Sequence, residues 1–106
     1  MLYIAEIPYE SGSLHFRYSR VMSGDGNRWI RHGIFTSFHE NGQRASEGFY
    51  EYGLETGMWQ DFHDNGQVAA EGEYVAGKEH GIWRHWDREG REEQSTRYNH
   101  GEAAGS

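Results

Sequence analysis

The feature that most constrains the fold is an internal repeat. Three glycines stand at equal intervals of 24 residues: Gly33, Gly57 and Gly81. They open three units, which span residues 33–56, 57–80 and 81–104. The first two units are identical at half of their positions, and the third keeps several of the same glycines and aromatic residues. A repeat of this length indicates supersecondary units stacked in a row, each burying its apolar side against the next.

Each unit has the pattern of a β-hairpin. Asn41-Gly42, and the equivalent pair in the second unit, lie between segments rich in β-forming residues. Asn-Gly is the preferred pair for a two-residue type I′ turn, in which both central residues take positive φ. A second connection carries a tyrosine and, three residues later, a glycine, as at Tyr50 and Gly53. No segment keeps a helical period without an interrupting glycine, so the sequence predicts strands throughout.

Gly48 and Gly72 lie inside the predicted second strands, where glycine normally weakens pairing. We interpret them as positions that leave room for a ring on a neighbouring strand to lie flat. Two sets of aromatic residues, at the third and sixth positions of each unit, are candidates. They are Phe35, Trp59 and Trp83, and Phe38, Phe62 and Trp86. These positions have opposite parity on a strand, so aromatic side chains are expected on both faces of the sheet.

The predicted fold is therefore all-β: an elongated, solenoid-like antiparallel sheet of tandem β-hairpin repeats, forming a single domain over residues 1–106. Residues 1–32 depart from the period, and we interpret them as the atypical N-terminal cap that a repeat stack needs. Leu2 to Tyr9 reads as a strand at one edge of the sheet. It carries little of the charge that normally protects a free edge, so it is a candidate for homodimer formation.

Composition excludes several classes of protein. The chain has no cysteine, which excludes disulfides, a thiol nucleophile and thiolate zinc sites. No apolar run is long enough for a membrane helix, so no membrane insertion is expected. The 17 acidic and 10 basic residues give a net charge of -7, which argues against direct nucleic-acid binding. The first residues lack the basic and apolar regions of a signal peptide, which indicates a cytoplasmic protein.

A set of residues in the second unit carries a resemblance to a known family. They are Gly57, Trp59, Phe62, Asn65, Gly66, Glu71, Gly72, Tyr74 and Gly77, with counterparts 24 residues to either side. Through them, residues 28–101 resemble the MORN-type repeat, and more closely the variant repeat of bacterial proteins classed as antitoxin components of toxin–antitoxin pairs. The resemblance implies a row of β-hairpins with scaffold and protein-binding roles and no catalytic residues. It lapses at Ser95-Thr96, where the pattern has Glu-Gly.

Metal binding and catalysis are the first functions that the polar residues suggest. His39 and His63 are repeat-equivalent, so two strand spacings separate them by roughly 9–10 Å, too far to share one ion. Glu47 and Glu71 are also repeat-equivalent, so their spacing follows from the repeat and not from a pocket. A single-layer sheet lacks the concavity that tunes a catalytic acid. We therefore expect no metal site, no cofactor and no enzyme activity.

Acidic charge is concentrated in the first two repeats. Residues 40–80 hold nine acidic residues against Arg44 and Lys78, a balance of -7. The repeat-equivalent acids expected to form rows along the sheet are Glu40 with Asp64, Glu47 with Glu71, and Glu55 with Glu79, and the last four are the expected contacts to a partner. Two interpretations stay open: a solvated face that keeps a thin sheet soluble, or an acidic strip that docks a basic partner and steers its approach.

The favoured function is a non-catalytic interaction module that binds another, basic protein. The aromatic residues expected to anchor that partner beside the four acids are Trp59, Trp83, Trp86, Tyr50 and Tyr74. In its most concrete form, drawn from the resemblance, this is an antitoxin or immunity-type protein that occludes a basic toxin. The alternative is a structural scaffold that self-associates through Leu2–Tyr9, and a carbohydrate- or peptide-binding platform comes third.

Overall fold

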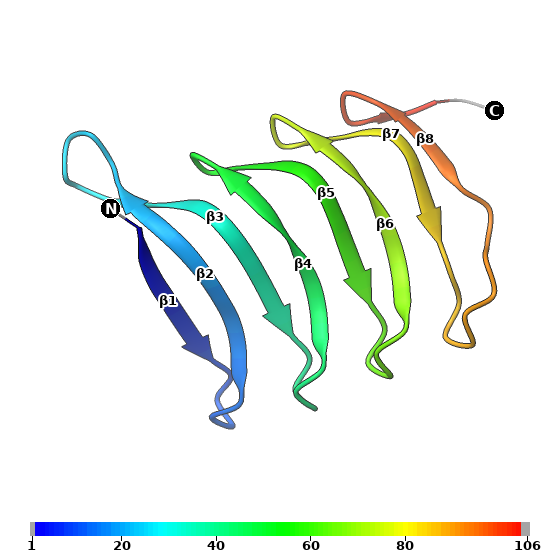
Figure 1. Cartoon of the computed structure of the whole chain (residues 1–106), viewed down its shortest axis with the longest axis horizontal. Coiled ribbons are helices and arrows are strands. Elements are labelled where there is room, and N and C mark those ends of the chain that lie inside the picture. Colours follow the sequence, from blue (N-terminus) through cyan, green and yellow to red (C-terminus); the bar gives the residue numbers. More distant parts are fainter. Residues whose placement is uncertain (1, 105–106) are drawn as a thin grey trace.

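The computed structural model describes residues 2–104, which form one sheet in which each strand pairs with its neighbours in sequence (Figure 1). The strands are β1 (Tyr3–Pro8), β2 (Leu14–Met22), β3 (Trp29–Phe38), β4 (Arg44–Glu51), β5 (Leu54–Phe62), β6 (Val68–Val75), β7 (Lys78–His85), β8 (Thr96–Asn99) and β9 (Glu102–Ala103). All pairings between them are antiparallel. The predicted all-β architecture of tandem hairpins is confirmed.

The sheet is a single, elongated and curved layer, with extents of 45 × 33 × 18 Å. Within residues 2–104, no second layer of strands or helices packs on it (Figure 1). Its core consists of rings on one side, which we call the aromatic face. The residues of this face that form the core cluster are Phe16, Tyr18, Phe35, Tyr50, Trp59, Tyr74, Trp83 and Tyr98.

Glycines make room for the core tryptophans. The register places Phe35 opposite Gly48, and Trp59 opposite Gly72. The indole ring of Trp59 also lies over Gly48 on the preceding strand, so closely that a Cβ atom added to this glycine would overlap the ring. Trp83 lies over Gly72 in the same way. The prediction that these glycines accommodate a ring is confirmed, and the ring comes from the third position of the unit.

Edge-to-face ring contacts connect successive repeats along the aromatic face. Tyr50 contacts Trp59 with a centroid distance of 5.3 Å and an interplanar angle of 87°, and Tyr74 contacts Trp83 at 5.1 Å and 83°. Between the two pairs, Trp59 meets Tyr74 at 5.7 Å and 74°. Such contacts add about 0.5–1.5 kcal/mol each beyond the burial of the rings. A column of rings thus takes the place of the aliphatic core that a thin sheet cannot enclose.

The sequence predicts type I′ turns at the Asn-Gly pairs, and this prediction is wrong. The type I′ turns lie at the second connection of each unit. Tyr52 and Gly53, the two residues between β4 and β5, have φ angles of 45° and 89°. The same geometry recurs at Ala76-Gly77 and at His100-Gly101. The Gly53 N–H donates to the carbonyl of Arg31 at 2.8 Å. A hydrogen bond to the preceding hairpin therefore supports the turn, and this bond cannot be inferred from the residues of the turn alone.

The Asn-Gly pairs belong to three-residue loops with a single left-handed glycine. In the first loop, the Gly42 N–H donates to the His39 carbonyl at 2.9 Å, and Gly42 has φ of 89°. The Asn41 side chain accepts from the Gln43 N–H at 2.9 Å and donates to the Asp64 carbonyl of the next unit at 2.6 Å. Asparagine is used here for these side-chain bonds, and the three-residue loop with a left-handed glycine replaces the predicted two-residue turn.

The third unit is shortened where its sequence departs from the repeat. β8 has 4 residues, whereas β4 and β6 each have 8. Thr96 stands where the first two units have glycine, and it pairs with Trp83. Closer to the loop, pairing is reduced to an isolated bridge between Trp86 and Glu92. The regular ladder between β7 and β8 is thus confined to the part from Thr96 onward, where threonine replaces the glycine of the first two units.

Candidate protein-binding surfaces

Two of the predicted aromatic anchors are buried. Trp59 and Trp83 are only 6% and 5% exposed. The indole Nε1 of each donates to a backbone carbonyl at 3.1 Å, of Phe49 and Glu73 respectively. Because each ring lies flat on a glycine, a single layer buries it without a covering element. The expectation that these tryptophans lie exposed toward a partner is wrong: both are core residues.

The register divides the predicted acids between the two faces of the sheet. The cross-strand pairs on the aromatic face include Tyr50 with Glu55 and Tyr74 with Glu79. Side chains alternate along a strand, so Glu47 points to the face opposite Tyr50, and Glu71 to the face opposite Tyr74. The four acids therefore form two short rows back to back and not one strip. A partner that docks on one face meets only one of these rows.

On the aromatic face, acids surround a half-buried tyrosine. Burial raises the pKa of Tyr74 to about 12, and the negative charges of Glu79, Glu55 and Asp61 contribute to the shift. The Tyr74 hydroxyl therefore stays protonated at neutral pH. The carboxylates of this row can accept hydrogen bonds, and its neutral phenols can donate or accept them. These groups are suited to binding another molecule.

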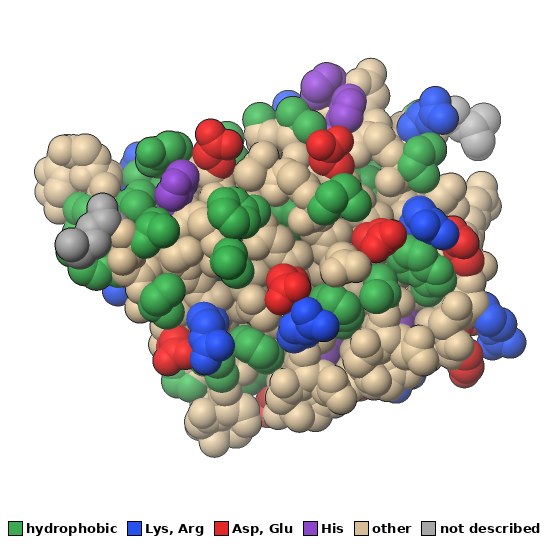
Figure 2. All heavy atoms as spheres, in the orientation of Figure 1, with side chains coloured by type: hydrophobic (Ala, Val, Ile, Leu, Met, Phe, Trp, Pro, Cys, Tyr) green, Lys and Arg blue, Asp and Glu red, His purple; other side chains and the backbone are tan. Residues whose placement is uncertain are grey.

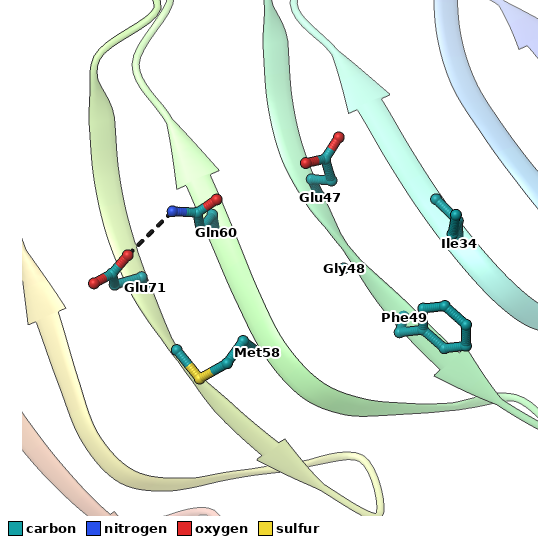
Figure 3. Close-up of a pocket in the computed structure, with 7 residues that line it drawn as sticks. All are labelled: Ile34, Glu47, Gly48, Phe49, Met58, Gln60 and Glu71. Atoms are coloured by element: carbon teal, nitrogen blue, oxygen red, sulfur yellow. Dashed lines mark hydrogen bonds between the residues drawn. The ribbon is translucent and has the colours of Figure 1, made fainter.

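A groove on the opposite face brings together side chains from β3, β4, β5 and β6 (Figure 3). This outer groove has a volume of about 460 Å³ and is lined by Ile34, Glu47, Gly48, Phe49, Met58, Gln60 and Glu71. Its apolar side chains are exposed: Ile34 by 61%, Phe49 by 48% and Met58 by 63%. Figure 2 shows hydrophobic side chains lying among acidic and basic ones over the middle of the sheet.

Both acids of the outer groove have partners within the chain. The Arg44 guanidinium lies 3.0 Å from the Glu47 carboxylate. The Gln60 amide donates to Glu71 at 3.1 Å (Figure 3), and the Arg84 guanidinium lies 3.9 Å from the same carboxylate. Ion pairs at this degree of exposure contribute about 1 kcal/mol or less to stability. A cation from a partner can therefore replace either arginine at little cost.

Trp86 differs from the other two predicted tryptophan anchors because it is only half-buried. The Arg84 guanidinium lies 5.0 Å from the centre of its ring. Trp86 and Glu71 both line a smaller groove of about 270 Å³ beside the outer groove. The structure thus brings together these two predicted site residues, at the end of the face that carries the outer groove.

Repeat-equivalent histidines connect successive loops. His39 and His63 each bond through Nε2 to a backbone carbonyl at 2.8 Å, of Phe62 and Trp86 respectively. A carbonyl only accepts, so Nε2 carries the proton in both. Among residues 2–104, no group of three or more His, Asp or Glu side chains is placed to hold a metal ion. These two histidines fasten the loop of one unit to the strand end of the next.

The apolar residues of the outer groove were not identified from the sequence. Ile34 and Met58 each directly precede a core ring, and Phe49 directly follows a core glycine. Alternation along each strand was the available signal, because neighbours of core positions must point to the other face. Alternation does not show which exposed side chains meet across strands, because these contacts depend on the register of the strands.

The fold and its surface define a class of protein, an open sheet of tandem β-hairpins with exposed grooves. The family model of the MORN repeat variant matches residues 31–52 and 55–76, which correspond to the hairpins β3–β4 and β5–β6. These matches support tandem hairpins of the MORN type in this part of the chain. No curated protein and no solved structure matches the chain. The described residues contain no helix with the length and apolarity to cross a membrane.

Proposed function

We propose that this chain is a non-catalytic protein-binding module whose main docking surface is the outer groove. The observation that carries the proposal is the exposure of three large apolar side chains beside a cross-strand row in which Gln60 separates two carboxylates, Glu47 and Glu71 (Figure 3). The complementary partner is an extended segment of another protein in which an apolar side chain is flanked by Lys or Arg. Adjacent exposed apolar groups with a polar rim are typical of protein-binding surfaces.

The apolar floor and the acidic rim have separate tasks in this proposal. Covering the exposed parts of Ile34, Phe49 and Met58 contributes to affinity at about 25 cal/mol per Å² of apolar surface removed from water. Glu47 and Glu71 exchange their intrachain arginines for partner cations, which adds specificity and speeds association. Trp86, at the end of the same face, extends the contact. The acids of the aromatic face, Glu55 and Glu79, are proposed as a secondary contact together with Tyr50 and Tyr74.

The most specific form of the proposal is an antitoxin or immunity-type protein that occludes a basic toxin. It draws on the resemblance of the repeat and on the net charge of -7. In this form, the partner's basic segment lies across β3–β6, and steric coverage inactivates it.

A selection from a random peptide library displayed on phage tests the docking surface. We expect enriched peptides to carry an apolar residue flanked by Lys or Arg, and their binding to weaken as salt rises. The variant Met58→Lys places a cation in the groove and should lower binding at least about tenfold, which corresponds to about 1.4 kcal/mol. Ile82→Lys is the matched control, because Ile82 is also exposed but does not line the groove. Equal binding to both variants would contradict the proposal.

Self-association is a second candidate, favoured by the edge of the sheet. Within residues 2–104, β1 pairs with β2 alone, so its other side presents free backbone groups. Tyr3, Ile4 and Ile7 on this strand are all exposed. Pairing of β1 with β1 of a second copy would be insensitive to salt, in contrast to groove binding. Sedimentation of the wild type and of Ile4→Lys tests it, because an inserted lysine blocks edge pairing; a monomeric wild type would exclude this candidate.

A further inference from the structure

The structure places two arginines directly opposite each other on the aromatic face. Arg20 on β2 and Arg31 on β3 are cross-strand partners in the antiparallel register. Like charges in this position destabilise a sheet. Within residues 2–104, neither arginine forms an ion pair, although the chain as a whole is acidic. The two positive charges therefore lie side by side without an internal counter-ion.

Aromatic rings hold both guanidinium groups. Arg20 lies 4.1 Å from the centre of the Trp29 ring, and Arg31 lies 4.9 Å from that of Tyr18. Arg31 also donates one hydrogen bond, of 3.5 Å, to the Tyr50 hydroxyl. The Nε atom of Arg20 is buried and has no hydrogen-bond partner. An arginine carries five N–H donors, so this pair leaves most of its donors unused in a fixed, ring-supported position.

The repeat itself does not require arginine here. Counting forward by 24 residues from Arg31 leads to Glu55 and then to Glu79. All three stand at the same place in their hairpins, on the aromatic face and one strand away from a tyrosine. The second and third units thus fold with glutamate at this position. The hairpin therefore does not need a positive charge at this position, although the Arg31 guanidinium also packs on the rings of Tyr18, Phe35 and Tyr50.

A groove beside this pair is open to a ligand. It has a volume of about 510 Å³, and the residues that line it include Arg28, Trp29, Arg31, Tyr50, Tyr52 and Glu55. Trp29 is 43% exposed, so part of its ring remains accessible. Arg28 adds a third positive charge that forms no ion pair within the described residues. Positive charge and ring surface thus meet at one end of β3.

We propose that this groove binds an oxyanion, a carboxylate or phosphate group, carried by a ligand whose flat apolar part lies against Trp29. Arg31 supplies a planar fork that pairs with two oxygens at once, Arg28 adds charge to the lining of the groove, and Arg20, which stacks on Trp29 without lining the groove, adds charge nearby. A bound oxyanion also removes the repulsion between Arg20 and Arg31, so binding stabilises the fold. None of the residues that line this site lines the outer groove, but the site shares Tyr50 and Glu55 with the proposed secondary contact.

Glu55 is expected to lower the affinity of the site for an oxyanion, and its replacement supplies a second test. It lines the same groove, yet it forms no ion pair with Arg28 or Arg31 in the part of the chain described here. Its negative charge opposes an incoming oxyanion across the groove. The variants Arg31→Glu and Glu55→Gln should therefore change affinity in opposite directions, whereas loss of unrelated surface charge should change it little.

Titration of the full chain with benzoate and with phenyl phosphate, followed by NMR, tests the proposal. The two probes distinguish a carboxylate from a phosphate as the preferred group, and sodium chloride at the same ionic strength is the reference. We expect saturable shifts of the Arg20 and Arg31 side-chain N–H signals and of the Trp29 indole signal. We expect Arg31→Glu to lower the affinity at least about tenfold, as expected for loss of a charge-assisted hydrogen bond.

Glu55→Gln should raise the affinity by about twofold or more, since it removes a nearby like charge. Arg97→Glu is the matched control: it makes the same charge change on exposed β8, and it should leave the affinity within about twofold. The inference is overturned if the shifts follow chloride alone, if Arg31→Glu binds like the wild type, or if Glu55→Gln weakens binding. Because Glu55→Gln makes no large structural change, the test holds even if Arg31→Glu does not fold.

Discussion

Trp59 lies flat over Gly48, and its indole Nε1 donates a hydrogen bond to the carbonyl of Phe49, the residue that follows this glycine. The glycine and the tryptophan thus fit together as one packing unit, with the ring fixed both by contact and by a hydrogen bond. Trp83 and Gly72 repeat the arrangement 24 residues later. Burial of aromatic rings in a single-layer sheet depends on this unit.

Gly48→Ala should destabilise the protein by about 2 kcal/mol, because the added methyl group overlaps the Trp59 ring and forces it out of place. Urea unfolding followed by tryptophan fluorescence measures the change. Gly24→Ala is the matched control, since Gly24 lies in a turn with nothing within 4 Å of an added Cβ. Equal stability of the two variants would show that Trp59 does not pack on Gly48.

Trp59→Ala and Met58→Ala compare how much the side chains on the two faces of β5 contribute to stability. Removal of the buried Trp59 side chain should cost about 3–5 kcal/mol, because it leaves a cavity in the column of rings. Met58 is 63% exposed, so its removal should change stability by about 0.5 kcal/mol or less. Thermal unfolding monitored by circular dichroism measures both. A stable Trp59→Ala protein would return this tryptophan to the list of partner anchors.

The repeat made the architecture predictable, and it also identified the glycines that hold the rings. A 24-residue period with glycine inside the second strand leaves few folds other than stacked hairpins. The burial of Trp59 was not predictable, because it depends on the ring lying over the preceding strand. The face of Glu47 relative to Tyr50 follows from alternation alone. The neighbours of Glu47 across strands, such as Gln60, require the register.

Turn types were assigned wrongly because the deciding bonds are not local. Asn41-Gly42 has the residues of a type I′ turn, but the Asn41 side chain bonds to Asp64 of the next unit. Tyr52 does not favour positive φ by itself, yet the amide of Gly53 after it bonds to Arg31 of the preceding hairpin. The sequence alone shows that Arg31 stands at the position that Glu55 and Glu79 occupy in the following units. The expected row of Glu55 with Glu79 takes no account of this change of charge.

Ala76→Gly should stabilise the protein by about 0.5 kcal/mol. Ala76 has φ of 50°, a conformation that costs a non-glycine residue about 1 kcal/mol, and the greater freedom of glycine in the unfolded chain offsets part of the gain. Chemical denaturation with linear extrapolation measures the difference. Ala69→Gly, inside β6, is the control, and it should lower stability by about 0.5–1 kcal/mol. A loss of stability in Ala76→Gly would contradict the left-handed geometry of this turn.

Titration of Tyr74 tests the acidic row on the aromatic face. Burial, followed by the charges of Glu79 and Glu55, raises the pKa of Tyr74 from 10.0 to about 12 in the folded protein. The folded state therefore prefers the protonated phenol. Its contribution to stability is complete below pH 10 and is lost as the pH rises from 10 to about 12. Tyr74→Phe should remove this part of the alkaline loss of stability.

Glu79→Gln should lower the pKa of Tyr74, because it removes the charge that contributes most to opposing formation of the phenolate. Ultraviolet absorbance of tyrosinate, taken as the difference between each protein and its Tyr74→Phe version, isolates this titration from those of the other tyrosines. Glu89→Gln is the matched control, because Glu89 lies in the loop between β7 and β8 and does not contribute to the shift. If Glu79→Gln and Glu89→Gln give the same titration of Tyr74, the carboxylates of this row do not act on the phenol, and the row does not exist as an electrostatic unit.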